Sequence, residues 1–367
     1  METKKMKRMM AKAYKSGAIF LSLLFLSAAQ LAAQEEVSKE FHKEYTAKQG
    51  MMLNLNNRYG DIVIQTSESD QLVINVTVTV KYPNKEKAEK LLGYIDVQFE
   101  QGENTISAKT IIDDKFNFSG WGDNRRFSID YDVKMPSWMD LTLLNRYGNT
   151  DLDDLSGLVQ LDIKYGNLTA NNLTRGNVKP LNNINISYGK GSLNDAGWLD
   201  ATIRYCSLVK MNKCQALLLD AKYSSVEIGT ASSIVGETKY NKLRVDELNN
   251  LVLEAGYDDV NIGTLTRKLD FNGDYGSFNV DRVTAGFESV NVESHYMGVK
   301  VAIDNDASYK LNAHVSYGSL KFNEEDFSNQ KRIIENNSSN VEGIVGKEAN
   351  PKATVTVEAS YGGVRLF

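Results

Sequence analysis

The sequence predicts an all-β protein whose larger part is a parallel β-helix, a solenoid of short stacked strands. Three observations support this fold class. Tyrosine recurs at a nearly constant interval through almost half of the chain, glycine often follows it directly, and apolar residues alternate in step with each tyrosine. Units that repeat in this way cannot bury their apolar faces alone, so they stack and pair each strand with its counterpart in the next unit.

The tyrosine repeat has gaps of 17 to 23 residues, most often 17 or 18. Its members are Tyr147, Tyr165, Tyr188, Tyr205, Tyr223, Tyr240, Tyr257, Tyr275, Tyr296 and Tyr317. Glycine follows five of them, and two further copies, Tyr59-Gly60 and Tyr361-Gly362, flank the series. We therefore expect Tyr-Gly-centred coils of 17–21 residues, with the tyrosines forming a ladder along the solenoid. A leucine-rich repeat is the alternative solenoid, but its period of 20 to 29 residues is longer than the dominant spacing here.

The copy at 251–265 shows how one coil is built. Apolar residues occupy every second position up to Tyr257 and therefore share one face of a strand. After a turn, Val260 and Ile262 continue the apolar pattern in a second strand. This phase predicts that Tyr257 points inward at a corner, where the small Ala255 leaves room for the ring. The glycine that often follows the tyrosine is expected to take the turn conformation that a Cβ would penalise.

The first 33 residues predict a secretory signal peptide. Six Lys and Arg side chains lie within residues 1–16, an apolar run covers 18–26, and small residues lead up to Ala33. This run is too short for a membrane-spanning helix, which needs about 20 apolar residues, and no other stretch is suitable. Cleavage after Ala33 removes six positive charges and one negative, and so changes the net charge from −5 to −10. Such an acidic product is a poor partner for nucleic acid.

The remaining chain divides into two predicted parts. Residues 34–140 form a β-rich N-terminal module that holds the first coil strand and a cap, because the end of a solenoid exposes strand edges that must be covered. Within it we expect strands at 71–80, 95–112 and 126–135 and a short helix at 85–92. Residues 141–367 form the parallel β-helix, with a mobile polar excursion at 323–350 before a last pair of strands.

The pattern resembles a family of bacterial secreted putative adhesins with a β-helical fold, including members of unknown function compared with autotransporter adhesin heads. The resemblance rests on Tyr131-Asp-Val-Lys-Met-Pro136, on 141–152, on Leu155-Ser-Gly157 and on the serial Tyr-Gly copies. It implies a right-handed β-helix and a location in the periplasm, at the outer membrane or on the cell surface. It brings no catalytic residue.

Few residues are suited to chemistry. His42, His295 and His314 show no metal-binding spacing, although His295 and His314 fall on neighbouring coils and could form a pair rather than two separate surface histidines. Cys206 and Cys214 are the only cysteines, and they form either a disulfide between strands of one coil or two separate semi-buried thiols.

Acidic residues fall on successive coils and are interpreted as a solvated face. They are Asp151, Asp153, Asp154, Asp258, Asp259, Asp274 and Asp281. A calcium or sugar site is the alternative, since two carboxylates about 5 to 9 Å apart suit glycoside cleavage. The sequence predicts no catalytic, cofactor-binding or metal-binding residue.

These observations predict a non-enzymatic, exported envelope protein without a cofactor, an adhesin or scaffold with a repetitive surface. Its expected partners are glycans or proteins of the envelope or cell surface, and not nucleic acid. Two alternatives stay open: a carbohydrate-active β-helix enzyme of the polysaccharide lyase or hydrolase type, and a periplasmic protein that maintains the envelope.

Overall fold

The computed structural model describes residues 35–118, 126–335 and 337–367. The predicted signal peptide, residues 1–33, lies outside the described residues. The described chain is all-β, as predicted, and its 23 strands belong to one hydrogen-bonded sheet. The chain forms two compact units, one made of 78–95, 112–127 and the segment up to 39, and a larger one made of 40–77, 96–111 and 128–367.

The smaller unit contains the predicted helix, α2 (Lys85–Leu92), and parts of β1 (Glu35–Thr46) and β4 (Gln71–Tyr82). Asn84 caps the helix by accepting a hydrogen bond of 2.8 Å from the backbone N–H of Lys87, which satisfies one of the free donors of the first turn. The expected helix at 85–92 is therefore confirmed.

The other strands lie wholly or mainly in the larger unit. They are β2 (Met52–Arg58), β3 (Ile62–Ser67), β5 (Ile95–Gln101), β6 (Thr105–Ile112), β7 (Arg126–Pro136), β8 (Asp140–Arg146), β9 (Thr150–Leu152), β10 (Val159–Lys164), β11 (Leu168–Leu173), β12 (Asn182–Ser187), β13 (Lys190–Arg204), β14 (Leu208–Lys222), β15 (Ser225–Lys239), β16 (Lys242–Val283), β17 (Ser289–Ile303), β18 (Tyr309–Ser316), β19 (Ser319–Lys321), β20 (Phe327–Glu335), β21 (Ser338–Val345), β22 (Ala353–Ser360) and β23 (Gly363–Leu366). A 3-10 turn, η1 (Glu324–Asp326), precedes β20.

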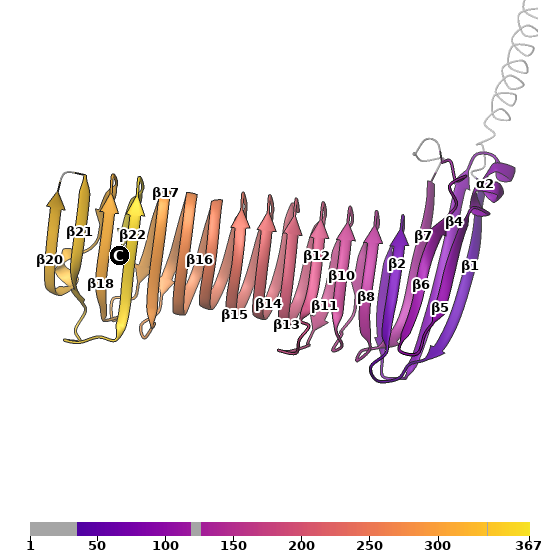
Figure 1. Cartoon of the computed structure of the whole chain (residues 1–367), viewed down its shortest axis with the longest axis horizontal. Coiled ribbons are helices and arrows are strands. Elements are labelled where there is room, and N and C mark those ends of the chain that lie inside the picture. Colours follow the sequence, from indigo (N-terminus) through magenta and orange to yellow (C-terminus); the bar gives the residue numbers. More distant parts are fainter. Residues whose placement is uncertain (1–34, 119–125, 336) are drawn as a thin grey trace, which may run out of the picture. The chain divides into compact units, whose positions relative to one another are not determined.

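Most of the larger unit is held together by parallel pairing between strands about one repeat apart (Figure 1). Strand β14 pairs with β13 on one side and with β15 on the other, so Leu217 lies opposite both Leu199 and Ile234. These side chains are at most 1% exposed. Because every coil places its apolar residues at the same positions, the core is a set of apolar rows along the direction of stacking.

Two segments take places in the stack that differ from their order in the chain. Strand β2 pairs in parallel with β8, although 81 residues separate Arg58 from Asp140 in the sequence. The first Tyr-Gly copy, which follows β2, therefore lies beside the copy that follows β8. Strand β22 pairs in parallel with both β17 and β18, and so the last coil of the sequence lies between two earlier ones.

The segment 323–350, predicted as a polar excursion, contains a hairpin. Strand β21 is antiparallel to both β18 and β20. Its Val341 is fully buried. The hairpin therefore extends the sheet beyond β18, with β21 antiparallel to β18 and β20 running in the same direction as β18.

Candidate functional site: a tyrosine edge and an adjoining groove

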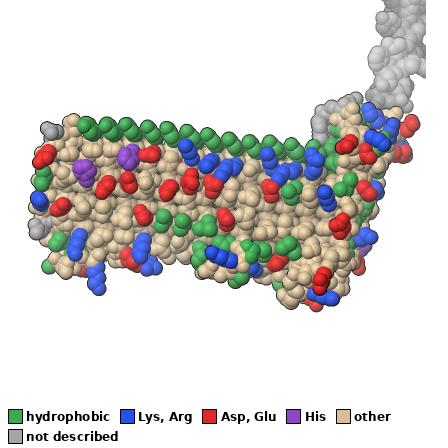
Figure 2. Space-filling view, viewed as in Figure 1, with side chains coloured by type: hydrophobic (Ala, Val, Ile, Leu, Met, Phe, Trp, Pro, Cys, Tyr) green, Lys and Arg blue, Asp and Glu red, His purple; other side chains and the backbone are tan. Residues whose placement is uncertain are grey.

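One long edge of the larger unit consists of stacked tyrosine rings, and Figure 2 shows it as a continuous row of apolar side chains. The centroids of neighbouring rings are 4.6 to 5.1 Å apart and their planes differ by 3 to 19°. In spatial order the rings are Tyr59, Tyr147, Tyr165, Tyr188, Tyr205, Tyr223, Tyr240, Tyr257, Tyr275, Tyr296, Tyr361 and Tyr317. We call this row the tyrosine ladder, and its formation confirms the expected ladder.

The backbone at each ladder tyrosine is left-handed, with φ between 51 and 64°. Among the described residues, these tyrosines account for every non-glycine residue with positive φ. The prediction that the following glycine supplies a conformation of this kind holds only for Gly276, whose φ is 109°, and is wrong for the other glycines that follow ladder tyrosines. An L-residue held in this region destabilises the fold by about 1–2 kcal/mol. A stacked aromatic pair stabilises the fold by about 0.5–1.5 kcal/mol in addition to the contribution of the area that it buries.

The glycines after the tyrosines have a different role, which is close approach of neighbouring coils. A Cβ on Gly166 would lie 1.8 Å from the carbonyl oxygen of Gly148, and a Cβ on Gly189 would lie 1.9 Å from that of Gly166. Only glycine lets the backbone approach so closely.

The ladder rings point outward, which corrects the prediction of inward rings at a corner. Eleven of the twelve are 40–59% exposed, whereas Leu253 and Ala255, on the strand that leads to Tyr257, are buried. The left-handed residue ends the strand's alternation and redirects its own side chain. Since each ring face is covered by the next ring, the groups left exposed are ring edges and hydroxyls.

The residues directly before the tyrosines are basic in most of the first seven coils. They are Arg58, Arg146, Lys164, Arg204, Lys222 and Lys239. The Nζ atoms of Lys164 and Lys239 lie 5.2 and 5.6 Å from the ring centroids of Tyr165 and Tyr240. Figure 2 shows basic side chains beside the ladder over this part of the unit. Sequence reasoning missed this row, although the pairing of Lys or Arg with the following tyrosine is visible in the repeat.

Below the ladder, four coils carry a buried polar side chain where most others have glycine. These residues are Cys206, Ser224, Asn241 and Asp258. Each of the last three accepts a hydrogen bond from a backbone N–H of the preceding coil: Ser224 Oγ from Cys206 at 3.0 Å, Asn241 Oδ1 from Ser224 at 2.9 Å, and Asp258 Oδ1 from Asn241 at 2.5 Å. The row thus links four coils through side chain to backbone bonds.

Asp258 is only 1% exposed, so its assignment to a solvated face was wrong. It also accepts hydrogen bonds from the Thr238 hydroxyl at 2.8 Å and the Gly256 N–H at 3.0 Å. Burial raises the pKa of Asp258 above its ordinary value, and these hydrogen bonds only partly offset that effect. Asp259, Asp274 and Asp281 are exposed, as predicted.

Both cysteines are buried free thiols, so the disulfide alternative is excluded. Burial raises the pKa of Cys206, and raises that of Cys214 to about 12.

The histidines do not converge on one site. His42 lies in β1 and contacts Asn75 Oδ1 through Nδ1 at 2.7 Å. The Nδ1 atom of His295 is 3.3 Å from Asp274 Oδ1. His314 lies opposite Glu358 of β22, the strand that separates it from β17 and His295. In the part of the chain that the structure describes, no group of three His, Cys, Asp or Glu residues is arranged to hold a metal ion.

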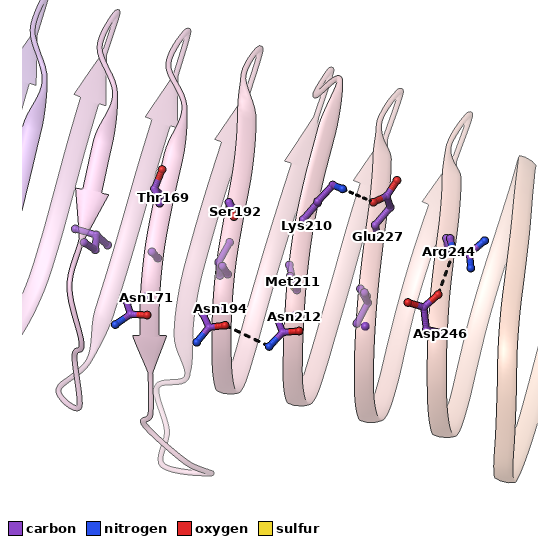
Figure 3. A pocket seen from close by; sticks show the side chains of 15 residues that line it. Thr169, Asn171, Ser192, Asn194, Lys210, Met211, Asn212, Glu227, Arg244 and Asp246 are labelled. Carbon is purple, nitrogen blue, oxygen red and sulfur yellow. Dashed lines mark hydrogen bonds and ion pairs between the residues drawn. The ribbon is translucent and has the colours of Figure 1, made fainter.

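A shallow polar groove of about 510 Å³ crosses the strands that follow the tyrosines (Figure 3). Its labelled side chains are Thr169, Asn171, Ser192, Asn194, Lys210, Met211, Asn212, Glu227, Arg244 and Asp246. Lys210 and Glu227 form an ion pair of 3.0 Å, as do Arg244 and Asp246. The amide of Asn212 donates to Asn194 Oδ1 at 3.2 Å. These contacts occupy part of the hydrogen-bonding capacity of the groove.

Within the described ranges, no helix is both long and apolar enough to cross a membrane.

No protein-family model matches the chain, and no curated protein matches it. Among solved structures it is similar to a "putative cell adhesion protein" of Clostridium sporogenes, with 13% identity, 90% of this chain and 99% of that chain covered, and a TM-score of 0.19. It is also similar to a "putative adhesin" of Parabacteroides distasonis, with 12% identity, coverage of 72% and 97%, and a TM-score of 0.30. A "putative lipid binding protein" of the same species has 11% identity, coverage of 90% and 97%, and a TM-score of 0.25. Likeness at these identities and TM-scores carries no argument about the ligand of this chain.

Proposed function

We propose that this chain is a non-enzymatic, exported envelope protein, an adhesin or scaffold, which binds an extended partner along the tyrosine ladder. The single observation that carries the proposal is the unbroken row of exposed, stacked rings. Each ring requires an unfavourable backbone conformation, and eleven rings remain about half exposed. Aromatic side chains of this kind dominate the energetics of interfaces, and a long exposed apolar edge is typical of an interaction site.

The fold that we infer for the larger unit is a right-handed parallel β-helix. Its support is the residue-by-residue parallel pairing of β13, β14, β15 and β16 at repeat spacing, together with the stacking of equivalent tyrosines. Such a rod presents the same groups at each coil, which suits a linear partner that contacts many coils weakly.

Binding is favoured over a carbohydrate-active enzyme by the state of the acidic residues. Asp258, whose pKa burial raises, is enclosed and bonded on both oxygens, so it has no access to a substrate. Asp274 is exposed and lies 3.3 Å from His295. Asp304 forms an ion pair of 2.8 Å with Arg282. An enzyme would instead need a poised acid and base that converge on one cleft.

The proposed binding surface is tested with a variant that removes two adjacent rings, Tyr205→Asn and Tyr223→Asn. Asparagine tolerates the left-handed backbone, so the fold is expected to persist. Leu218→Asn with Val235→Asn is the matched control, because both side chains are 44% exposed and lie opposite each other on the same unit.

The readout is retention of the exported chain and its variants on bacterial and host cells and on immobilised surface glycans and matrix proteins. We expect the tyrosine variant to lose binding and the control to keep it. Equal binding by both would refute the ladder as the binding surface. Protease treatment of intact and lysed cells separates the two locations: cleavage on intact cells supports an adhesin, and cleavage only after lysis supports a periplasmic scaffold.

A further inference from the structure

The basic row beside the ladder is confined to one half of it. In register from coil to coil, Arg58 lies opposite Arg146, which lies opposite Lys164, and after Ser187 the row resumes with Arg204, Lys222 and Lys239. The equivalent positions in the remaining coils are Gly256, Asp274, His295, Ser360 and Ser316. We call the first seven ladder tyrosines and the six basic residues before them the basic strip.

Folding alone does not explain this row, because like charges directly opposite each other on neighbouring strands destabilise a sheet. Only part of the charge is neutralised by partners on the same face. Arg146 Nη1 donates to Asp162 Oδ1 at 2.9 Å, and Arg204 pairs with Asp220. Lys222 lies between Arg204 and Lys239 in register. Features that cost stability in this way are expected where a surface has a function.

The tyrosines add to the same electrostatic character. Their faces are covered by neighbouring rings, so the strip presents ring edges, which carry partial positive charge, and hydroxyl donors. Ring edges, hydroxyls and ammonium groups all attract anions. A sugar or base has no free ring face on which to stack within the ladder.

Acidic residues form one border of the strip. Asp162, Asp220 and Glu237 precede the basic residues Lys164, Lys222 and Lys239 by two positions, on the same outward face of their strands. An anionic ligand would be repelled from this second row, so it is held along the line between the tyrosine hydroxyls and the basic side chains. The surface that attracts anions is thus a narrow line rather than a broad patch.

The geometry points to a linear acidic polysaccharide as the ligand of the basic strip, with about one acidic sugar ring for each coil. This inference rests on the proposed function and names its partner. Successive rings of the strip are 4.9 to 5.1 Å apart, which is about the length of one sugar ring. In an extended acidic peptide both the rise per residue, about 3.3 Å, and the distance between side chains on the same face, about 6.6 to 6.8 Å, differ from the spacing of the coils. The net negative charge of the chain opposes polyanions elsewhere on its surface.

The experiment compares the full exported chain with two triple variants. The first neutralises the strip by Lys164→Gln, Lys222→Gln and Lys239→Gln. The matched control makes the same change in charge outside the strip by Lys300→Gln, Lys310→Gln and Lys352→Gln, all at exposed positions. The probes are polygalacturonate, its neutral methyl ester, poly-glutamate and single-stranded DNA, each measured at low and at physiological salt.

We expect the wild-type chain to bind polygalacturonate more tightly than the other three probes, with an affinity that falls as salt rises. The strip variant should bind about tenfold or more weakly and with a smaller salt dependence, and the control should bind like wild type. The strip variant should unfold at about the same urea concentration as the wild type, because it removes opposed like charges together with the contacts of Lys164 and Lys239 with tyrosine rings.

Four results would overturn the inference. Equal losses in both variants would show a non-specific charge effect, and equal binding of poly-glutamate or DNA would show a general polyanion site. Lower stability of the strip variant would show that the lysines are structural. If the lysine variant binds cells normally while the Tyr205→Asn and Tyr223→Asn variant does not, the ladder is the binding surface but its partner is not an acidic polysaccharide.

Discussion

Gly166 lies so close to Gly148 that a Cβ on Gly166 would be 1.8 Å from the carbonyl oxygen of Gly148. The obstacle is backbone of the neighbouring coil, so Gly166→Ala must separate two coils or distort a turn. We expect this change to lower the free energy of unfolding by about 3 kcal/mol or more. Gly176→Ala is the control, since nothing lies within 4 Å of its Cβ position. Urea unfolding measures both, and equal effects would contradict the close-approach role.

Substitutions at Tyr257 separate backbone strain from ring stacking. Its ring centroid lies 4.8 Å from that of Tyr240 and 4.6 Å from that of Tyr275, and its φ is 59°. Tyr257→Ala loses the stacking and keeps the strain, and we expect it to cost about 2–3 kcal/mol. Tyr257→Gly loses the same stacking but removes the strain, so it should be more stable than the alanine variant by about 1 kcal/mol. The opposite order in urea unfolding would mean that the left-handed backbone is not strained.

Asp258 is expected to make stability depend on pH. Its folded pKa is raised, mainly by burial, so the folded state holds the proton more tightly than the unfolded state does. Its contribution is therefore full below the ordinary carboxyl pKa of about 4 and is lost as pH rises through the folded pKa.

The measurement is the difference in unfolding free energy between the wild-type chain and Asp258→Asn as a function of pH. We expect this difference to shift against the wild type as the pH rises above about 4. Asp259→Asn makes the same change at the exposed neighbouring position and is the control for the substitution itself. A flat difference for Asp258→Asn would show that the buried carboxyl does not titrate differently in the two states.

The two thiols are expected to be unreactive in the folded protein. Both are buried, and the raised pKa of Cys206 and of Cys214, which reaches about 12, leaves little thiolate near neutral pH. A thiol reagent at neutral pH should label neither cysteine in the native chain and both in denaturant. Rapid labelling of the native chain would mean that these coils open locally.

The strand positions were predictable because burial sets the alternation. Leu217, Leu219 and Ala221 are spaced by two residues in the sequence, and all three are buried in β14. The direction of the tyrosines was not predictable from the same alternation, because a left-handed residue interrupts it. The basic residues of the strip are visible before the tyrosines in the sequence, but their alignment into one row depends on register between coils.

The order of the final coils could not be predicted from the repeat either. Equivalent positions in every coil carry similar residues, so the pattern identifies a coil without giving its neighbours. Tyr361 follows Tyr317 by 44 residues in the sequence, yet its ring lies between those of Tyr296 and Tyr317. The inserted β20–β21 hairpin supplies the length of chain for this return.

The insertion of β22 between β17 and β18 has a consequence for how the chain matures. In a chain that emerges from its N-terminus, residues 353–360 of β22 follow both β17 and β18. Until then β17 and β18 each lack the strand that pairs with both of them. The ladder therefore becomes continuous only once β22 has taken its place, so a chain truncated before 353 would carry a gap at this point, with two open strand edges that invite aggregation.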